Sequence, residues 1–304
     1  MSNSNRSHRV GTTGNLQHSM RANYGEHGVD NYYKKVGATY RNPHFPGVRA
    51  CMFTWLDRWW AHEQDLVGSR LPLIFDMACG IGEVTVAAYE WWKHGPSRPQ
   101  ANRKGHAYRQ FRSGDGSISQ APQADSTDPK NGTAGSAALQ VPRGLSIMAA
   151  DPYTVEAYVE RTTLPCEPLS FREISEGALP SPTSLGLTTT GQTTDGEPDQ
   201  LTPSAREVDD AATPKEMDMA VCSFALHLIE FPSELFALLW ELSTKARWLV
   251  VLAPHKKPEI KDGWGWVKWD CERWAECDMS DRGGENVQER VHCRVYRSIN
   301  VAPP

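Results

Sequence analysis

The 304-residue sequence lacks the features that mark several broad classes of protein. It has no apolar run near the roughly 18 residues of a membrane span and no signal peptide, so we expect neither a membrane protein nor a secreted one. Its seven cysteines are scattered, without CxxC pairs or histidines at zinc spacing. This favours reduced thiols in the cytoplasm or nucleus and no metal site. With 32 basic and 37 acidic residues there is no overall basic footprint for nucleic acid.

What the chain does contain is enough apolar material for one sizeable core. Hydrophobic residues make up 39% of it, including 11 tryptophans. The mean hydropathy is nevertheless low, −0.54, because two long segments are rich in Gly, Pro, Ser and Thr. We expect residues 96–143 and 181–214 to be disordered insertions, and residues 1–22 to be a disordered tail. One domain over residues 23–304 would then hold the rest.

A short glycine-containing turn organises this domain. Residues 71–75 are an apolar run typical of a buried strand, and a helix-forming segment with several aromatics begins soon after Gly82. A turn between a strand and a helix presents backbone N–H groups to a ligand. A dinucleotide fingerprint would need a third glycine where Thr85 stands, and Glu83 would repel a pyrophosphate. The alternative is a cofactor without phosphates.

The pattern Asp-x-Ala-Cys-Gly-x-Gly in this turn resembles motif I of the class I, or seven-β-strand, S-adenosylmethionine-dependent methyltransferases. In that family an acidic residue at the strand end lies near the methionine moiety, and the glycine turn passes beneath the ligand. The resemblance therefore implies that S-adenosyl-L-methionine is the cofactor and is bound by Asp76, Ala78, Cys79, Gly80 and Gly82.

An acidic residue after the second strand supports this interpretation. Residues 145–149 read as a strand that ends at Asp151 and Pro152, where adenosine-binding sheets hold the ribose hydroxyls. Such an acid usually follows the glycine turn by about 20 residues. Asp151 follows Gly82 by 69 positions, and the 48 residues of segment 96–143 account for all but 21 of them.

Two later segments complete the expected cofactor site. Residues 170–179 suggest a weak strand, and the resemblance places an adenine contact near its end, at Ser175 or Glu176. Residues 217–222 suggest a buried strand whose exit resembles family motif IV, which implies that the backbone of Ser223, Phe224 and Ala225 passes the methyl donor. His227 could act as a general base, although packing beside the next helix is the favoured interpretation.

The N-terminal region is dense in aromatic residues. A short helix is expected over residues 29–36 and an amphipathic helix over 48–62, whose tryptophans we expect to pack on the sheet. Between them, the prolines of a YRNPHFP segment fix a turn. Its polar residues Tyr40, Arg41 and His44 are candidates for substrate contact or for a lid. Residues 23–68 would form a helical cover over the domain.

The expected fold is α/β: a Rossmann-like, doubly wound seven-stranded sheet with one antiparallel strand, an N-terminal helical cover and two disordered insertions. The expected activity is methyl transfer from S-adenosyl-L-methionine to a small molecule or a protein residue. No Asn-Pro-Pro-aromatic tetrad follows the fourth strand, which argues against the amide and adenine N-methyltransferases that use it. Two alternatives stay open. One is a non-catalytic module with a methyltransferase-like fold that binds an adenosyl ligand or acts by interaction. The other is an NAD-dependent oxidoreductase, which Glu83 and Thr85 disfavour.

Overall fold

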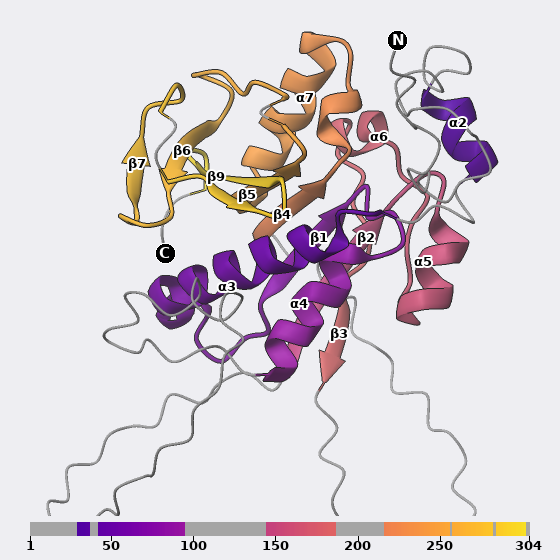
Figure 1. Cartoon of the computed structure of the whole chain (residues 1–304), viewed down its shortest axis with the longest axis horizontal. Helices are drawn as coiled ribbons and strands as arrows, with labels where there is room; N and C mark the ends of the chain where they lie inside the picture. Colours follow the sequence, from indigo (N-terminus) through magenta and orange to yellow (C-terminus); the bar gives the residue numbers. More distant parts are fainter. Residues whose placement is uncertain are drawn as a thin grey trace, which may run out of the picture.

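The structure is a computed structural model that describes residues 29–36, 42–94, 144–186, 216–255, 257–281 and 284–301 (Figure 1). These residues form a mixed α/β domain around one sheet. Its strands lie in the order β3-β2-β1-β4-β5-β9-β6-β7, and β8 pairs with β9. The expected tail (residues 1–22) and the whole of the first expected insertion (residues 96–143) lie outside the described residues.

The centre of the sheet consists of four neighbouring parallel strands. They are almost wholly buried, as their continuous apolar runs predict. Three of them confirm the strands expected from the sequence to within two residues at each end: β1 (Leu73–Met77), β2 (Gly144–Ala150) and β4 (Met217–Ser223). The fourth is β5 (Ala246–Ala253).

The flanks of the sheet are antiparallel and more extensive than expected. The prediction of a single antiparallel strand in a seven-stranded sheet is wrong, because the described part contains nine strands and three of them run against β1. The reversed strands are β3 (Thr183–Gly186), β9 (Val291–Ser298) and β7 (Ala275–Cys277). The remaining two strands are β6 (Trp266–Asp270) and β8 (Asn286–Gln288).

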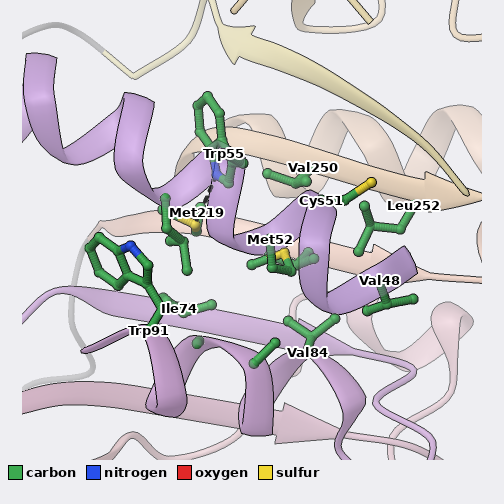
Figure 2. Packing of buried hydrophobic residues seen from close by; sticks show 14 of the residues in the cluster. Val48, Cys51, Met52, Trp55, Ile74, Val84, Trp91, Met219, Val250 and Leu252 are labelled. Carbon is green, nitrogen blue, oxygen red and sulfur yellow. Dashed lines mark hydrogen bonds between the residues drawn. The ribbon is translucent and has the colours of Figure 1, made fainter. Parts of the chain in front are cut away.

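Helices cover both faces of the sheet (Figure 1). Alternate residues of β1 face opposite ways, so Ile74 packs with α3 (Phe45–Val67) and α4 (Glu83–His94), whereas Phe75 packs toward α7 (Pro232–Ser243). Figure 2 shows the first layer, in which Trp55 donates from its indole N–H to the Met219 sulfur at 3.4 Å. The tryptophans of α3 therefore pack on the sheet, as predicted.

Two predictions about the segment after β2 are wrong. Residues 170–179 do not form a strand, since α6 (Phe171–Ser175) lies there. Ser170 and Glu173 form a capping box: the Ser170 hydroxyl accepts from the backbone N–H of Glu173, and the Glu173 carboxylate accepts from the backbone N–H of Ser170. This arrangement starts a helix at Phe171. The second insertion is also not wholly without structure, because β3 pairs with the edge of β2 through residues 183–186.

The position of the N-terminal cover follows from α2 and its contact with the segment before α5. α2 (Val29–Val36) has the predicted bounds, and its Tyr33 stacks on Tyr153 at 5.9 Å, just before α5 (Val155–Thr162). α2 therefore lies beside the carboxyl end of β2. In the part of the chain that the structure describes, no helix is both long and apolar enough to cross a membrane.

Candidate functional site

The candidate site lies where β1, β2 and β4 end. β1 pairs with β2 on one side and with β4 on the other, so the connections leaving these strands diverge at this point. Open α/β sheets bind ligands outside the carboxyl ends of the strands at such a switch point. The glycine turn follows β1, Asp151 follows β2, and Ser223 ends β4.

The glycine turn is built from left-handed backbone. Ala78, Gly80 and Gly82 have φ angles of 52°, 57° and 87°. A Cβ atom at Gly82 would lie 2.6 Å from the Thr162 side chain, so this glycine lets α5 pack closely. A Cβ at Gly80 would meet only the end of the Glu83 side chain, at 3.2 Å. Gly80 is thus the glycine whose surface a ligand could approach.

Asp151 holds this turn in place. Its Oδ2 accepts a hydrogen bond from the backbone N–H of Gly80 at 3.1 Å, and its Oδ1 accepts from the N–H groups of Tyr153 and Thr154 at 2.8 and 3.0 Å. The hydroxyl of Thr154 donates in turn to the Gly80 carbonyl at 2.5 Å. Burial raises the pKa of Asp151, and these backbone bonds oppose the shift. Pro152 stands half-buried beside the carboxylate.

Asp76 lies behind the turn and not on its open side. It is 1% exposed, and its Oδ2 accepts from the backbone N–H and hydroxyl of Thr85 at 3.0 and 2.7 Å. Its Oδ1 is buried and has no partner among the described residues. Burial raises the pKa of Asp76 to about 8. The geometry gives Asp76 a role in supporting the start of α4.

Glu83 occupies the N-terminus of α4. It is 5% exposed, and its Oε1 lies 3.6 Å from Nη1 of Arg161 on α5. Burial raises the pKa of Glu83, while backbone hydrogen bonds from Glu83 itself, Asn42 and Ile81 oppose the rise. The carboxylate therefore uses N–H groups that a helix N-terminus could offer to a phosphate.

A pocket of about 510 Å³ opens beside Glu83, between the start of α3 and the facing sides of α4 and α5. The guanidinium of Arg161 lies over the Phe45 ring at 5.1 Å and donates to the Ile81 carbonyl at 3.4 Å. The start of α3 is therefore docked against the glycine turn. The lining residues are Asn42, Phe45, Ile81, Glu83, Ala157, Glu160 and Arg161.

The exit of β4 forms the opposite side of the site. Phe224 has a φ of 58°, and its N–H donates to the Leu252 carbonyl of β5 at 2.8 Å. Its ring stacks on His44 at 5.1 Å, which joins the predicted N-terminal turn to β4. Ala225 lies half-buried beyond it and precedes the short helix η1 (Leu226–Leu228). The Ser223 hydroxyl is buried and has no partner among the described residues.

Two further histidines meet beyond this exit. His227 in η1 and His255 after β5 have ring centroids 5.0 Å apart in an edge-to-face arrangement. Burial, with a smaller contribution from His255, lowers the pKa of His227 to about 4. Burial and nearby Arg290 likewise lower the pKa of His44. His227 is thus a neutral imidazole near pH 7 and a weak base.

The structure does not bring every predicted residue to this edge. Glu176 ends α6 and pairs with exposed Arg172, and the next residue, Gly177, receives a hydrogen bond from Lys245 immediately before β5. Ser175 bonds to the Arg172 carbonyl. These residues lie toward the amino end of β5, because the segment is a helix and not a strand. Tyr40 and Arg41 lie outside the described residues.

Two residues of the site could not be predicted from the sequence. Arg161 sits on α5 without any motif and reaches Glu83 only through packing of α5 on α4. Cys166 lies beyond α5, yet its sulfur is 3.5 Å from that of Cys79 in the glycine turn. Within the described ranges, no three His, Cys, Asp or Glu side chains gather as a metal site.

Comparison with known proteins finds a relative in Schizosaccharomyces pombe, the uncharacterized protein C17A5.05c. It is 35% identical over 287 residues, which cover 94% of this chain and 95% of the relative. This chain belongs to the same family as the S. pombe protein. No family model matches the chain, and no solved structure matches it either. Because the alignment spans nearly all of both proteins, membership of this family rests on the whole chain and not on the glycine turn alone.

Proposed function

We propose that the protein is a class I methyltransferase that binds S-adenosyl-L-methionine at the carboxyl edge of a Rossmann-like sheet. The observation that carries the proposal is the hydrogen bond between Asp151 and Gly80. It joins the acid expected to hold a ribose to the glycine expected to lie under the ligand. Backbone N–H groups fix the carboxylate before any ligand binds, as preorganised recognition requires.

The Glu83 carboxylate favours a cofactor without phosphates. A dinucleotide would place its pyrophosphate at the N-terminus of α4, where it would meet a buried acidic group. Thr85 uses its N–H and hydroxyl on Asp76, so it is part of the support for α4. Both features support S-adenosyl-L-methionine, which has no phosphate, over NAD as the cofactor.

The acceptor side of the proposed site is framed by the β4 exit and the turn before α3. His44 stacks on Phe224, and Phe45 contacts Arg161, so this turn spans from β4 to α5 across the glycine turn. Methyl transfer from a sulfonium needs an aligned acceptor above all, because the leaving group is already activated. A turn that covers the strand ends can supply this alignment.

Calorimetric titration with S-adenosylhomocysteine and, separately, with NAD tests the cofactor. We expect S-adenosylhomocysteine to bind with micromolar affinity, about −8 kcal/mol, and NAD not to bind. Gly80→Val should abolish binding, because the new side chain fills the turn. Glu176→Ala, which lies toward the amino end of β5 and away from the carboxyl ends of the strands, is the control and should bind like the parent. Binding of NAD alone to the folded protein would refute the proposal.

An interaction module with this fold is the second candidate. Its support is an exposed aromatic surface on α7, where Phe236 and Trp240 are 40% and 43% exposed and lie 6.0 Å apart. Phe231 nearby is 61% exposed. Failure of S-adenosylhomocysteine to bind, together with loss of a protein complex in Trp240→Ala, would favour this candidate over the enzyme.

A further inference from the structure

The carboxyl ends of β4 and β5 carry a cluster of polar groups that the cofactor contacts do not account for. We infer that the methyl acceptor is a carboxylate, bound beside Ser223, His227 and His255 and methylated on one of its oxygens. This inference rests on the proposed function and names the class of its acceptor.

Two buried atoms in the cluster need a partner. The Ser223 hydroxyl and Nδ1 of His227 are both shielded from solvent, and within the described part of the chain neither makes a hydrogen bond. Buried polar atoms are nearly always satisfied, and a polar ligand at the carboxyl end of β4 would satisfy both of these atoms. A hydroxyl and a neutral imidazole can each donate one hydrogen bond, which suits the two oxygens of a carboxylate.

The segments next to β4 and β5 carry basic groups, which suit an anion. Arg294 is buried and donates to the Pro258 and Lys257 carbonyls at 2.8 and 3.0 Å, which fixes the basic turn after β5 at this edge. The side chain of Lys257 is exposed, and so is that of Arg290 in the β8–β9 hairpin beside His44.

Among the residues that the structure describes, no carboxylate contributes to the pKa shift of His44 or His227. The pKa of His44 is lowered by burial and by Arg290, and that of His227 by burial and by His255. An anionic acceptor would supply the missing negative charge.

A carboxylate also fits the chemistry that the site can perform. One carboxylate oxygen donates an electron pair to the methyl carbon, the carbon–sulfur bond breaks, and its electron pair stays on sulfur. The products are a methyl ester and neutral S-adenosylhomocysteine, and no proton moves. An ammonium or phenol acceptor would have to lose a proton to a base, and His227 is too weakly basic to take it efficiently near pH 7.

The test uses the full chain, methyl-labelled S-adenosylmethionine and an extract of S. pombe cells that lack the relative C17A5.05c. Labelled products are then treated with mild base, which releases methanol from methyl esters and leaves methylamines and methyl ethers intact. We expect most of the protein-dependent label to appear as volatile methanol. Base-stable label, or no label above a Gly80→Val control while S-adenosylhomocysteine binds, would overturn the inference. Failure of S-adenosylhomocysteine to bind would instead defeat the proposed function itself.

Variants of His227 separate recognition from folding. His227→Leu should reduce base-labile labelling roughly tenfold or more, since it removes a hydrogen bond to a charged group. His227→Asn, which keeps a donor, should retain more activity, and exposed His94→Ala should behave like the parent. S-adenosylhomocysteine affinity should be equal in all three. Between about pH 7 and 9 the rate should be flat for a carboxylate acceptor. A rate that rises steadily with pH would contradict the inference.

Discussion

The backbone N–H of Gly80 donates a 3.1 Å hydrogen bond to the carboxylate of Asp151. The two residues are 71 positions apart in the chain and lie at the ends of neighbouring parallel strands. Thr154 closes the same contact from the other side, through its hydroxyl and the Gly80 carbonyl. The turn after β1 and the start of α5 therefore behave as one structural unit, and substitutions in it should affect stability and ligand binding in separable ways.

Gly80 and Gly82 provide a matched pair. Alanine at either position suffers left-handed backbone strain of about 1–2 kcal/mol. At position 82 the new methyl also collides with Thr162 and Tyr158, which adds about 1–3 kcal/mol of overpacking. We expect Gly82→Ala to lose clearly more unfolding free energy in urea. Gly80→Ala should show the greater loss of S-adenosylhomocysteine affinity per unit of stability lost. Equal effects of the two substitutions on both measurements would contradict this distinction.

Asp76 should make stability depend on pH. Its pKa is about 8 in the folded protein and near 4 when unfolded, so the folded state binds the extra proton between these values. The contribution is complete below about pH 4 and is lost as pH rises toward 8, with a slope of at most about 1.4 kcal/mol per pH unit. Asp76→Asn should flatten this fall in unfolding free energy between pH 5 and 8. Parallel curves for the two proteins would count against a protonated Asp76.

The turn before α3 should contribute more to activity than to stability. His44 is half-buried and contacts Phe224 at the proposed acceptor side, whereas the core of α3 lies deeper, around Trp55. We expect His44→Ala and Arg41→Ala to lower methyl transfer more than the melting temperature. Removal of residues 1–23 should change neither. If both substitutions lower the melting temperature without a separate effect on rate or on cofactor affinity, the turn serves packing alone.

The first polar insertion should be dispensable for the fold. It connects the end of α4 at His94 to the start of β2 at Gly144, and both elements are buried against the core without it. Replacing residues 97–142 by a short Gly/Ser linker should leave the melting temperature and S-adenosylhomocysteine affinity unchanged, because long surface loops add little closure entropy. A large fall in melting temperature would show that the segment packs. Intact binding with lost methyl transfer would make it a substrate element.

Sequence patterns predicted the elements whose burial is decided locally. The apolar runs at β1 and β4 predicted buried strands, and the periodicity of α3 predicted the face that packs on the sheet. The strand predicted around Phe171 was wrong, because the Ser-x-x-Glu capping box favours a helix more strongly than the apolar residues favour a strand. β3 was missed because pairing with an exposed edge of β2, and not its own composition, orders it.

The glycine turn and the acidic residues around it could be predicted locally, because turn geometry and charge depend on residue type at fixed spacing. Tertiary structure alone decided which groups meet. It directs Asp76 onto Thr85 and places Arg161 beside Glu83. It places Glu176 toward the amino end of β5 and not at the ligand edge. It also brought His255 onto His227. Such contacts arise from strand order and helix packing between residues far apart in the chain, which no local pattern encodes.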